Sequence, residues 1–128
     1  MAWCFRDEAT PQTDAVRDRV NRVGAVVPGH WPAEIENAAR MGERRRRATS
    51  EEIAAFVQFI RAQLIEVDQP QLETTFGDRL PLSRQYSLSV YDAAYVELAN
   101  RRGLPLATLD ANMRRAAQLM GIDLLDIC

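Results

Sequence analysis

Hydrophobic residues along the chain alternate between helical spacing and short continuous runs. Val16, Val20 and Val23 fall on one face of a predicted helix over residues 12–23, which Gly24 ends. Further helices, recognised from the same spacing and from their start and stop residues, are predicted over residues 32–41, 50–64, 70–80, 87–102 and 111–120.

Two of these helices carry the sharpest signals. Ser50 is the predicted N-cap of the segment that follows it, because Glu51 and Glu52 occupy the first turn. The segment 87–102 has the clearest apolar face, and Gly103 ends it. The apolar side chains expected to face the core from these two helices are Ile53, Phe56, Val57, Ile60, Leu64, Leu88, Tyr91, Tyr95, Leu98 and Ala99.

Four short apolar runs separate the helices and predict strands over residues 25–27, 64–68, 104–108 and 122–127. Strands that alternate with helices indicate an α/β fold with a mostly parallel sheet covered by helices on both faces. The length fits a single domain over residues 1–128. Ligands of such open sheets bind beyond the carboxyl ends of the strands, so a functional site is expected at that edge.

The composition narrows the function classes. Apolar residues make up 47% of the chain and charged residues 27%, as in ordinary globular proteins, and no apolar run approaches the ~20 residues of a membrane span. The net charge of −2 excludes a polycationic nucleic-acid coat protein. Cys4 and Cys128 lie at opposite ends of the chain, so two reduced thiols and a cytoplasmic location are expected.

All 16 basic residues are arginines, and four of them are consecutive: Arg44, Arg45, Arg46 and Arg47. Arg40 lies just upstream of this run. Planar guanidinium groups suit phosphate, so the run is a candidate contact for a phosphate-bearing ligand or a partner protein. A solvated loop or helix end is the alternative interpretation.

Three carboxylates, Glu34, Asp92 and Asp110, stand near the starts of predicted helices. Each has a structural explanation, since Asp92 completes a capping box with Ser89, Asp110 fits an N-cap and Glu34 falls in a first turn. Carboxylates that gather at one sheet edge repel each other, and this is tolerated best around a divalent cation. Oxygen ligands without a matching His or Cys set favour Mg²⁺ or Mn²⁺ over zinc. The three acids are therefore candidate catalytic and metal-binding residues.

Other polar residues near these acids have weaker claims. Asn37 shares a helix face with Glu34, and Thr108 lies beside Asp110, so both are candidates to support the acids. The alternatives are an exposed amide and an ordinary strand-end hydroxyl. His30, the sole histidine, is interpreted as a structural residue at a strand end, because no nucleophile motif accompanies it.

The segments around these acids resemble the PIN-domain ribonucleases, in particular the VapC-like toxins of bacterial toxin–antitoxin pairs. The resemblance covers essentially the whole chain in the right order and is most specific in its last two segments. The matching segments are 2–8 (AWCFRDE), 27–28 (VP), 31–37 (WPAEIEN), 88–95 (LSVYDAAY) and 103–110 (GLPLATLD).

The resemblance implies a PIN-like three-layer sandwich and a Mg²⁺- or Mn²⁺-dependent endoribonuclease toxin. Glu34, Asp92 and Asp110 match the family's second, third and fourth acids, and Asn37 and Thr108 fall on positions that support them. The resemblance further implies inhibition by a cognate antitoxin and a homodimer. A helical clip over residues 43–60 is expected to grip the antitoxin.

One part of the family pattern does not appear in the chain. The family's first acid ends an opening central strand, several residues before the tryptophan that matches Trp3, and would fall before Met1. We therefore expect an N-terminally shortened domain whose first central strand is missing. A catalytically inactive module that only binds antitoxin is accordingly the main alternative function, and an unrelated Mg²⁺ phosphohydrolase is a third.

Overall fold

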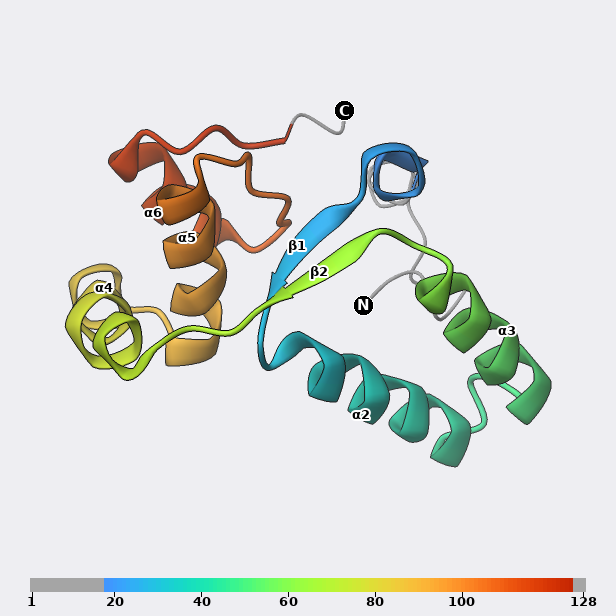
Figure 1. The fold of residues 1–128 in the computed structure, drawn as a ribbon. Coiled ribbons are helices and arrows are strands. Elements are labelled where there is room, and N and C mark those ends of the chain that lie inside the picture. Colours follow the sequence, from blue (N-terminus) through green and yellow to red (C-terminus); the bar gives the residue numbers. More distant parts are fainter. Residues whose placement is uncertain (1–17, 126–128) are drawn as a thin grey trace. The chain divides into compact units, whose positions relative to one another are not determined.

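The computed structural model describes residues 18–125, so that residues 1–17 and 126–128 fall outside the description. The described part is a mostly helical α/β protein with a small parallel sheet of two strands, β1 (Ala25–Pro28) and β2 (Ile65–Asp68) (Figure 1). Two helices connect the strands, as a crossover between parallel neighbours requires. The α/β class and the two strands predicted over 25–27 and 64–68 are confirmed.

Contacts divide the described chain into two compact units. Unit 1 comprises residues 18–26 and 30–67, and unit 2 comprises residues 27–29 and 68–125. The division runs through both strands. Each unit buries apolar side chains of its own.

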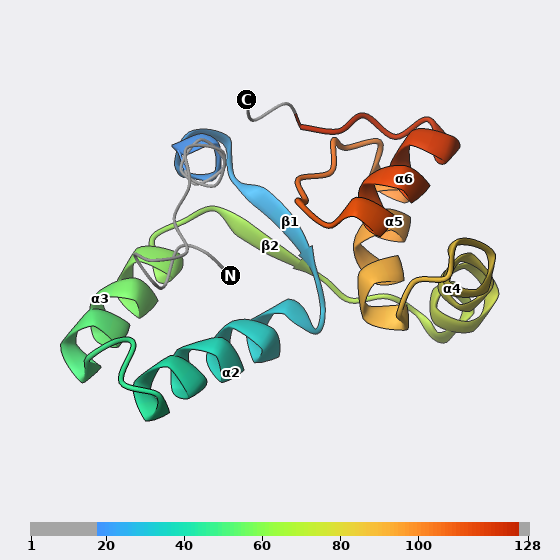
Figure 2. The same ribbon diagram turned by 180° about the vertical axis from the view of Figure 1, so that it is seen from behind.

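Unit 1 is built on the helices α2 (Trp31–Arg44) and α3 (Ser50–Arg61), which follow each other through a short turn (Figures 1 and 2). Residues 18–23 form a further helical segment, and the start predicted for it at residue 12 lies outside the described residues. The buried apolar side chains of unit 1 are Val20, Ala39, Ala48 and Phe56.

Gly24 makes the turn from this helical segment into β1. Its φ of +83° lies in the left-handed region, and its N–H donates to the carbonyl of Val20 at 2.9 Å. A Cβ at this position would collide with the carbonyl oxygen of Leu64. Glycine is therefore required both by the backbone conformation and by the close approach of the neighbouring chain, and the predicted helix stop is confirmed.

The start of α3 corrects the N-cap prediction. Thr49, and not Ser50, is the N-cap: its Oγ1 accepts from the N–H of Glu52 at 3.1 Å, and Glu52 Oε1 accepts from the N–H of Thr49 at 3.2 Å. This reciprocal capping box needs a Glu or Gln three residues after the cap. From Ser50 that position is Ile53, which cannot accept a hydrogen bond, so Ser50 becomes the first helical residue.

Three further expectations about unit 1 are wrong. The helix predicted to end near Met41 runs to Arg44, because the buried Gly42 costs a helix interior only about 1 kcal/mol and does not end it. Leu64, expected on the inner face of α3, is 74% exposed, since it lies beyond the end of that helix. Val57 is 44% exposed, beside the buried Phe56 on α3.

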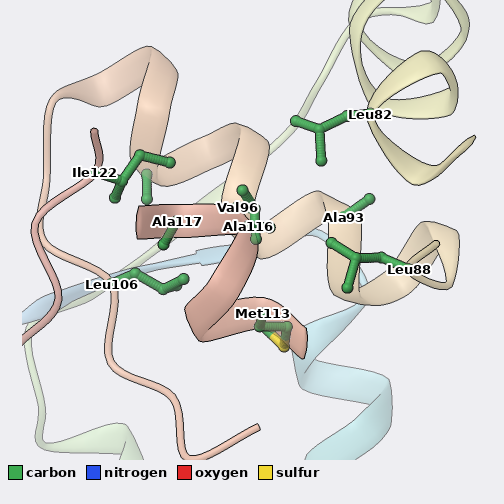
Figure 3. Close-up of a cluster of buried hydrophobic side chains, with 10 residues drawn as sticks. Leu82, Leu88, Ala93, Val96, Leu106, Met113, Ala116, Ala117 and Ile122 are labelled. Atoms are coloured by element: carbon green, nitrogen blue, oxygen red, sulfur yellow. The ribbon is translucent and has the colours of Figure 1, made fainter. Parts of the chain in front are cut away.

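Unit 2 packs helical segments around one apolar core. They are the π-helix η2 (Thr74–Arg79), α4 (Leu80–Tyr86), α5 (Val90–Arg102) and α6 (Ala111–Met120). Alanines on α5 and α6 are almost fully buried, so the two contacting helices approach closely. The core side chains, most of them labelled in Figure 3, are Leu82, Leu88, Ala93, Val96, Ala99, Leu106, Met113, Ala116, Ala117 and Ile122.

The helix stops of unit 2 agree with the sequence better than the helix starts do. Gly103 and Gly121 follow α5 and α6 with φ of +63° and +73°, as predicted. The helix expected from residue 87 begins at Val90, because Ser89 caps it. Tyr91 was expected in the core and is 61% exposed. Of the other residues expected there, Leu98 and Ala99 are buried and Tyr95 is half-buried.

The strands predicted over 104–108 and 122–127 shrink to a single parallel bridge between Leu106 and Leu124. Leu106 donates its N–H to Asp123 at 2.8 Å and accepts from Leu125 at 2.9 Å. Pro105 has no N–H to extend the ladder, so the apolar run is not sufficient for a strand. Residues 126 and 127 of the second predicted strand lie outside the described residues.

The helix predicted from Pro70 to residue 80 is displaced along the chain. Residues 72–86 are continuously helical, through η2 and α4, and Pro70 precedes them. Across residues 18–125, no helix has both the length and the apolar character that crossing a membrane demands.

Candidate functional site

Asp92 lies in the first turn of α5, in unit 2. Its N–H donates to the Oγ of the N-cap residue Ser89 at 3.0 Å, which confirms the Ser89 half of the predicted capping box. The return bond from the Ser89 N–H to the Asp92 carboxylate does not form between these two described residues, so the predicted box is incomplete. The Asp92 side chain is partly exposed, and its carboxylate forms no hydrogen bond or ion pair with any other residue in the range 18–125. The positive end of the helix dipole favours this anion. The backbone of Asp92 is thus fixed while its carboxylate is open to a ligand.

Asp110 is the N-cap residue of α6, also in unit 2. Its Oδ1 accepts from the N–H of Met113 at 2.9 Å, which confirms the predicted cap. The Oγ1 of Thr108 accepts from the N–H of Asp110 at 3.1 Å, and Arg114 Nη1 donates to the carbonyl of Thr108 at 2.9 Å. Thr108 therefore holds the backbone that presents Asp110, and the second carboxylate oxygen of Asp110 takes no part in the cap.

Glu34 stands in unit 1, in the first turn of α2. His30 is the N-cap residue of this helix, and its Nε2 lies 3.4 Å from Glu34 Oε1. The Glu34 side chain is 50% exposed, whereas that of His30 is 19% exposed. Asn37, three residues further along α2, is exposed. The predicted helix-start position of Glu34 is confirmed.

The structure distributes the candidate acids over the two units. Unit 2 holds Asp92 and Asp110, each at the start of a helix, and unit 1 holds Glu34. Within residues 18–125, no group of three or more His, Cys, Asp and Glu side chains gathers closely enough to hold a metal ion. The metal centre of three acids stays a prediction.

Comparison with known proteins places the chain in a family. No family model matches it. Ribonuclease VapC3 from two strains of Mycobacterium tuberculosis is 32% identical over 102 residues, which cover 80% of this chain and 72% of the relative. The chain belongs to the VapC-like family. The VapC-like part of the resemblance recognised in its sequence is thereby confirmed, while the shortened N-terminus stays a prediction.

Unit 2 of this VapC-like chain also contains a buried ionic cluster that the sequence did not reveal. Arg101 Nη1 and Nη2 donate to the carboxylate of Asp68 at 3.2 and 2.7 Å, and Arg101 Nε donates to both carboxylate oxygens of Glu97 at 3.0 Å. The Asp68 and Glu97 side chains are only 10% and 6% exposed. The cluster joins the end of β2 to the last turns of α5.

Charge pairing shifts the pKa values of Asp68 and Arg101 in the expected directions. The hydrogen bond from Arg101 lowers the pKa of Asp68, although burial acts the other way. Hydrogen bonds to Asp68 and Glu97 raise the pKa of Arg101 further. The spacing of four between Glu97 and Arg101 was readable as a helical pair, but no local pattern identifies Asp68 as the second partner.

Unit 1 of the VapC-like chain carries an apolar groove of about 370 Å³ between α2 and α3. Its floor includes Phe56 and Ala39, and Arg40 and Arg61 stand among its charged lining residues. The remaining lining residues are Trp31, Pro32, Ile35, Glu36, Glu43, Ile53, Val57 and Ile60. A groove of this kind suits the apolar face of a helix from a partner protein.

Proposed function

We propose that this chain is an endoribonuclease toxin that cleaves RNA phosphodiesters and is inhibited by a cognate antitoxin. Membership of the VapC-like family and the similarity to Ribonuclease VapC3 support this function. The observation that carries it is the state of Asp92, a carboxylate at a helix start with no protein partner among residues 18–125. Such a carboxylate is suited to binding a cation.

Asp92, Asp110 and Glu34 are the residues proposed to hold a divalent cation, Mg²⁺ or Mn²⁺. The chemistry of the donors fits, since all three are carboxylates and Mg²⁺ is bound by one or two carboxylates, waters and the phosphates of the substrate. When bound, the cation offsets charge on the attacked phosphate and lowers the pKa of the attacking water. The two acids of unit 2 are proposed as the first ligands, and Glu34 is proposed to complete the set.

The neighbouring residues are proposed to orient these acids. Ser89 fixes the backbone of Asp92 through the helix cap, and Thr108 fixes that of Asp110. Ser89 and Thr108 thereby fix the N-termini of α5 and α6, and the dipole of a helix start favours a nearby negative charge. Asn37 is proposed to support Glu34 from the next turn of α2.

The groove between α2 and α3 is the proposed docking site of the antitoxin. Its apolar floor and charged rim suit an amphipathic helix, and part of the predicted clip over residues 43–60 lines it. Val57 lines the groove and is 44% exposed, so its replacement by aspartate is expected to weaken antitoxin binding. Leu119→Asp, at an exposed apolar residue of α6 outside the groove, is the matched control.

We also propose a homodimer and a cytoplasmic location.

Cleavage of RNA by the purified chain with and without Mg²⁺ tests the function. Asp92→Asn keeps the size of the side chain but removes its charge. It is expected to lower kcat at least about a hundredfold, since metal-assisted charge stabilisation is worth several kcal/mol. Asp123→Asn, at an exposed acid of unit 2, should leave the rate unchanged. Cleavage that is independent of metal, or that survives Asp92→Asn, contradicts the proposal.

A further inference from the structure

The last residue of α2 and the three residues after it form the strongest run of like charge in residues 18–125. Arg44, Arg45, Arg46 and Arg47, together called the arginine turn, are consecutive and exposed. The nearby carboxylate of Glu43 lies 3.6 Å from Arg40, outside the turn. Among the described residues, no ion pair or side-chain hydrogen bond involves the first three of these arginines. Their charges are therefore available to a ligand.

The backbone of the arginine turn is fixed by hydrogen bonds to the end of α2. The N–H groups of Arg45, Arg46 and Arg47 donate to the carbonyls of Met41, Glu43 and Gly42 at 2.9, 3.1 and 2.8 Å. The last two bonds form a Schellman motif, the common way of closing a helix. The arginines thus project from an ordered turn, so the backbone of the turn loses little conformational entropy when a ligand binds.

The conformation of Arg46 is unfavourable for most residues other than glycine. Its φ of +57° lies in the left-handed region, at the position where a Schellman motif normally has glycine. The same motif closes α5 and α6 with Gly103 and Gly121. Ser87 is the other residue of the described chain, besides the glycines, with positive φ. An arginine therefore occupies a position where it strains the backbone, and strained positions of this kind are concentrated at functional sites.

We propose that the arginine turn binds the sugar–phosphate backbone of single-stranded RNA, an inference that rests on the proposed ribonuclease function. Guanidinium groups pair with phosphate through two parallel hydrogen bonds, and several of them in sequence suit a regular polyanion. A protein partner needs apolar anchors at the centre of its interface, and the turn has none. The apolar groove between α2 and α3 already offers such anchors. The turn therefore fits a nucleic-acid backbone better than it fits a protein.

Replacement of Arg46 by glycine separates the two roles of this residue. In Arg46→Gly the strain is relieved and the charge is lost, so thermal stability rises while RNA affinity falls. Binding of a mixed-sequence single-stranded RNA is measured in an Asp92→Asn background over a series of salt concentrations. We expect affinity to fall about two- to fivefold, as for one exposed charge contact. The slope of log K against log salt should become shallower by about 0.7, the value for one phosphate contact on a single strand.

Two control variants identify the cause of any change. Ser87→Gly relieves the same backbone strain without altering charge and should stabilise the protein with no effect on RNA affinity. Arg84→Gln removes an exposed arginine of α4 and should leave the salt slope unchanged. Equal changes of the slope in Arg84→Gln and Arg46→Gly overturn the inference, because net charge alone would then explain the binding.

The remaining outcomes are equally decisive. If Arg46→Gly weakens antitoxin binding and leaves RNA binding intact, the turn is a protein contact and the inference is wrong. Mg²⁺-dependent cleavage with an RNA affinity that does not depend on Arg46 overturns the inference and leaves the proposed function standing. Because binding is measured without cleavage, an affinity that depends on Arg46 supports the inference even if the chain cleaves no RNA.

Discussion

The guanidinium of Arg101 donates two parallel hydrogen bonds to the carboxylate of Asp68, a residue 33 positions away in the sequence. Its Nε also donates to Glu97 on the same helix. The two carboxylates are nearly buried, so each loses hydration, and the hydrogen bonds from Arg101 are the direct compensation. Arg101 thereby fastens the end of β2 to α5, the helix that begins beside Asp92.

Removal of Arg101 should destabilise the fold far more than removal of an exposed arginine. Arg101→Gln leaves two buried carboxylates without their hydrogen-bonded cation, a change that costs about 3–5 kcal/mol in a fully buried pair. The side chain of Arg101 is 37% exposed, and water screens part of the loss, so we expect about 2 kcal/mol. Urea unfolding measures this loss in the free energy of unfolding. Arg115→Gln, at an exposed position of α6, should change the free energy of unfolding by less than about 0.5 kcal/mol.

The same cluster should make the stability depend on pH on the acidic side. The hydrogen bond from Arg101 lowers the folded-state pKa of Asp68 below its usual value of 3.8. A lowered folded-state pKa means that this contribution is complete above the unfolded-state pKa and is lost as the pH falls from there through the folded-state pKa. The free energy of unfolding of the wild type should therefore fall over that interval. Asp68→Asn should show a shallower fall, and identical pH profiles would show that Asp68 contributes nothing.

Features that rest on neighbouring residues were readable from the sequence. Gly103 and Gly121 end their helices as predicted, because a left-handed residue after a helix selects for glycine. Asp110 and Ser89 cap their helices through residues three positions on. The N-cap of α3 was misassigned by one residue because two adjacent hydroxyl residues both satisfy the simple rule. The full capping box, which includes Glu52, selects Thr49.

Features that depend on contacts between segments far apart in the sequence could not be predicted from it. The apolar run over residues 104–108 has the composition of a strand, yet it pairs only through Leu106. Strand pairing also requires backbone hydrogen-bonding partners on a segment that is distant in the sequence. The bond between Asp68 and Arg101 has no local signature. For the candidate site, the sequence placed Asp92, Asp110 and Glu34 at helix starts correctly. Whether three acids gather around one ion is a property of tertiary arrangement, which local spacing does not determine.

The capping box of α3 predicts different contributions to stability from two adjacent residues, Thr49 and Ser50. Thr49→Ala removes the side-chain acceptor for the N–H of Glu52 and should cost about 1 kcal/mol. Ser50→Ala replaces the first helical residue with a better helix former, so its cost should be close to zero. Thermal and urea unfolding of the two variants give the comparison. Equal losses would mean that Thr49 is not the cap in solution.

Thr108 is expected to act on catalysis through Asp110. Thr108→Val keeps the shape of the side chain but removes the oxygen that accepts from the N–H of Asp110. The turn before α6 then loses one constraint, and the Asp110 carboxylate is held less firmly. Under the proposed function, kcat for RNA cleavage should fall about tenfold, the effect of losing about 1.4 kcal/mol of positioning, with little change in KM. The Mg²⁺ concentration that gives half-maximal rate should rise.

The Mg²⁺ requirement separates this positioning role from a merely structural one. Loss of stability alone lowers the amount of folded protein and leaves the half-maximal Mg²⁺ concentration unchanged. Thr108→Ser restores the hydroxyl and should recover both kcat and the Mg²⁺ requirement. Thr75→Val serves as the matched control, since the Thr75 hydroxyl donates to the carbonyl of Gln71 in a helix that carries none of the candidate acids. A Thr108→Val enzyme with the wild-type Mg²⁺ requirement would show that Asp110 does not depend on Thr108.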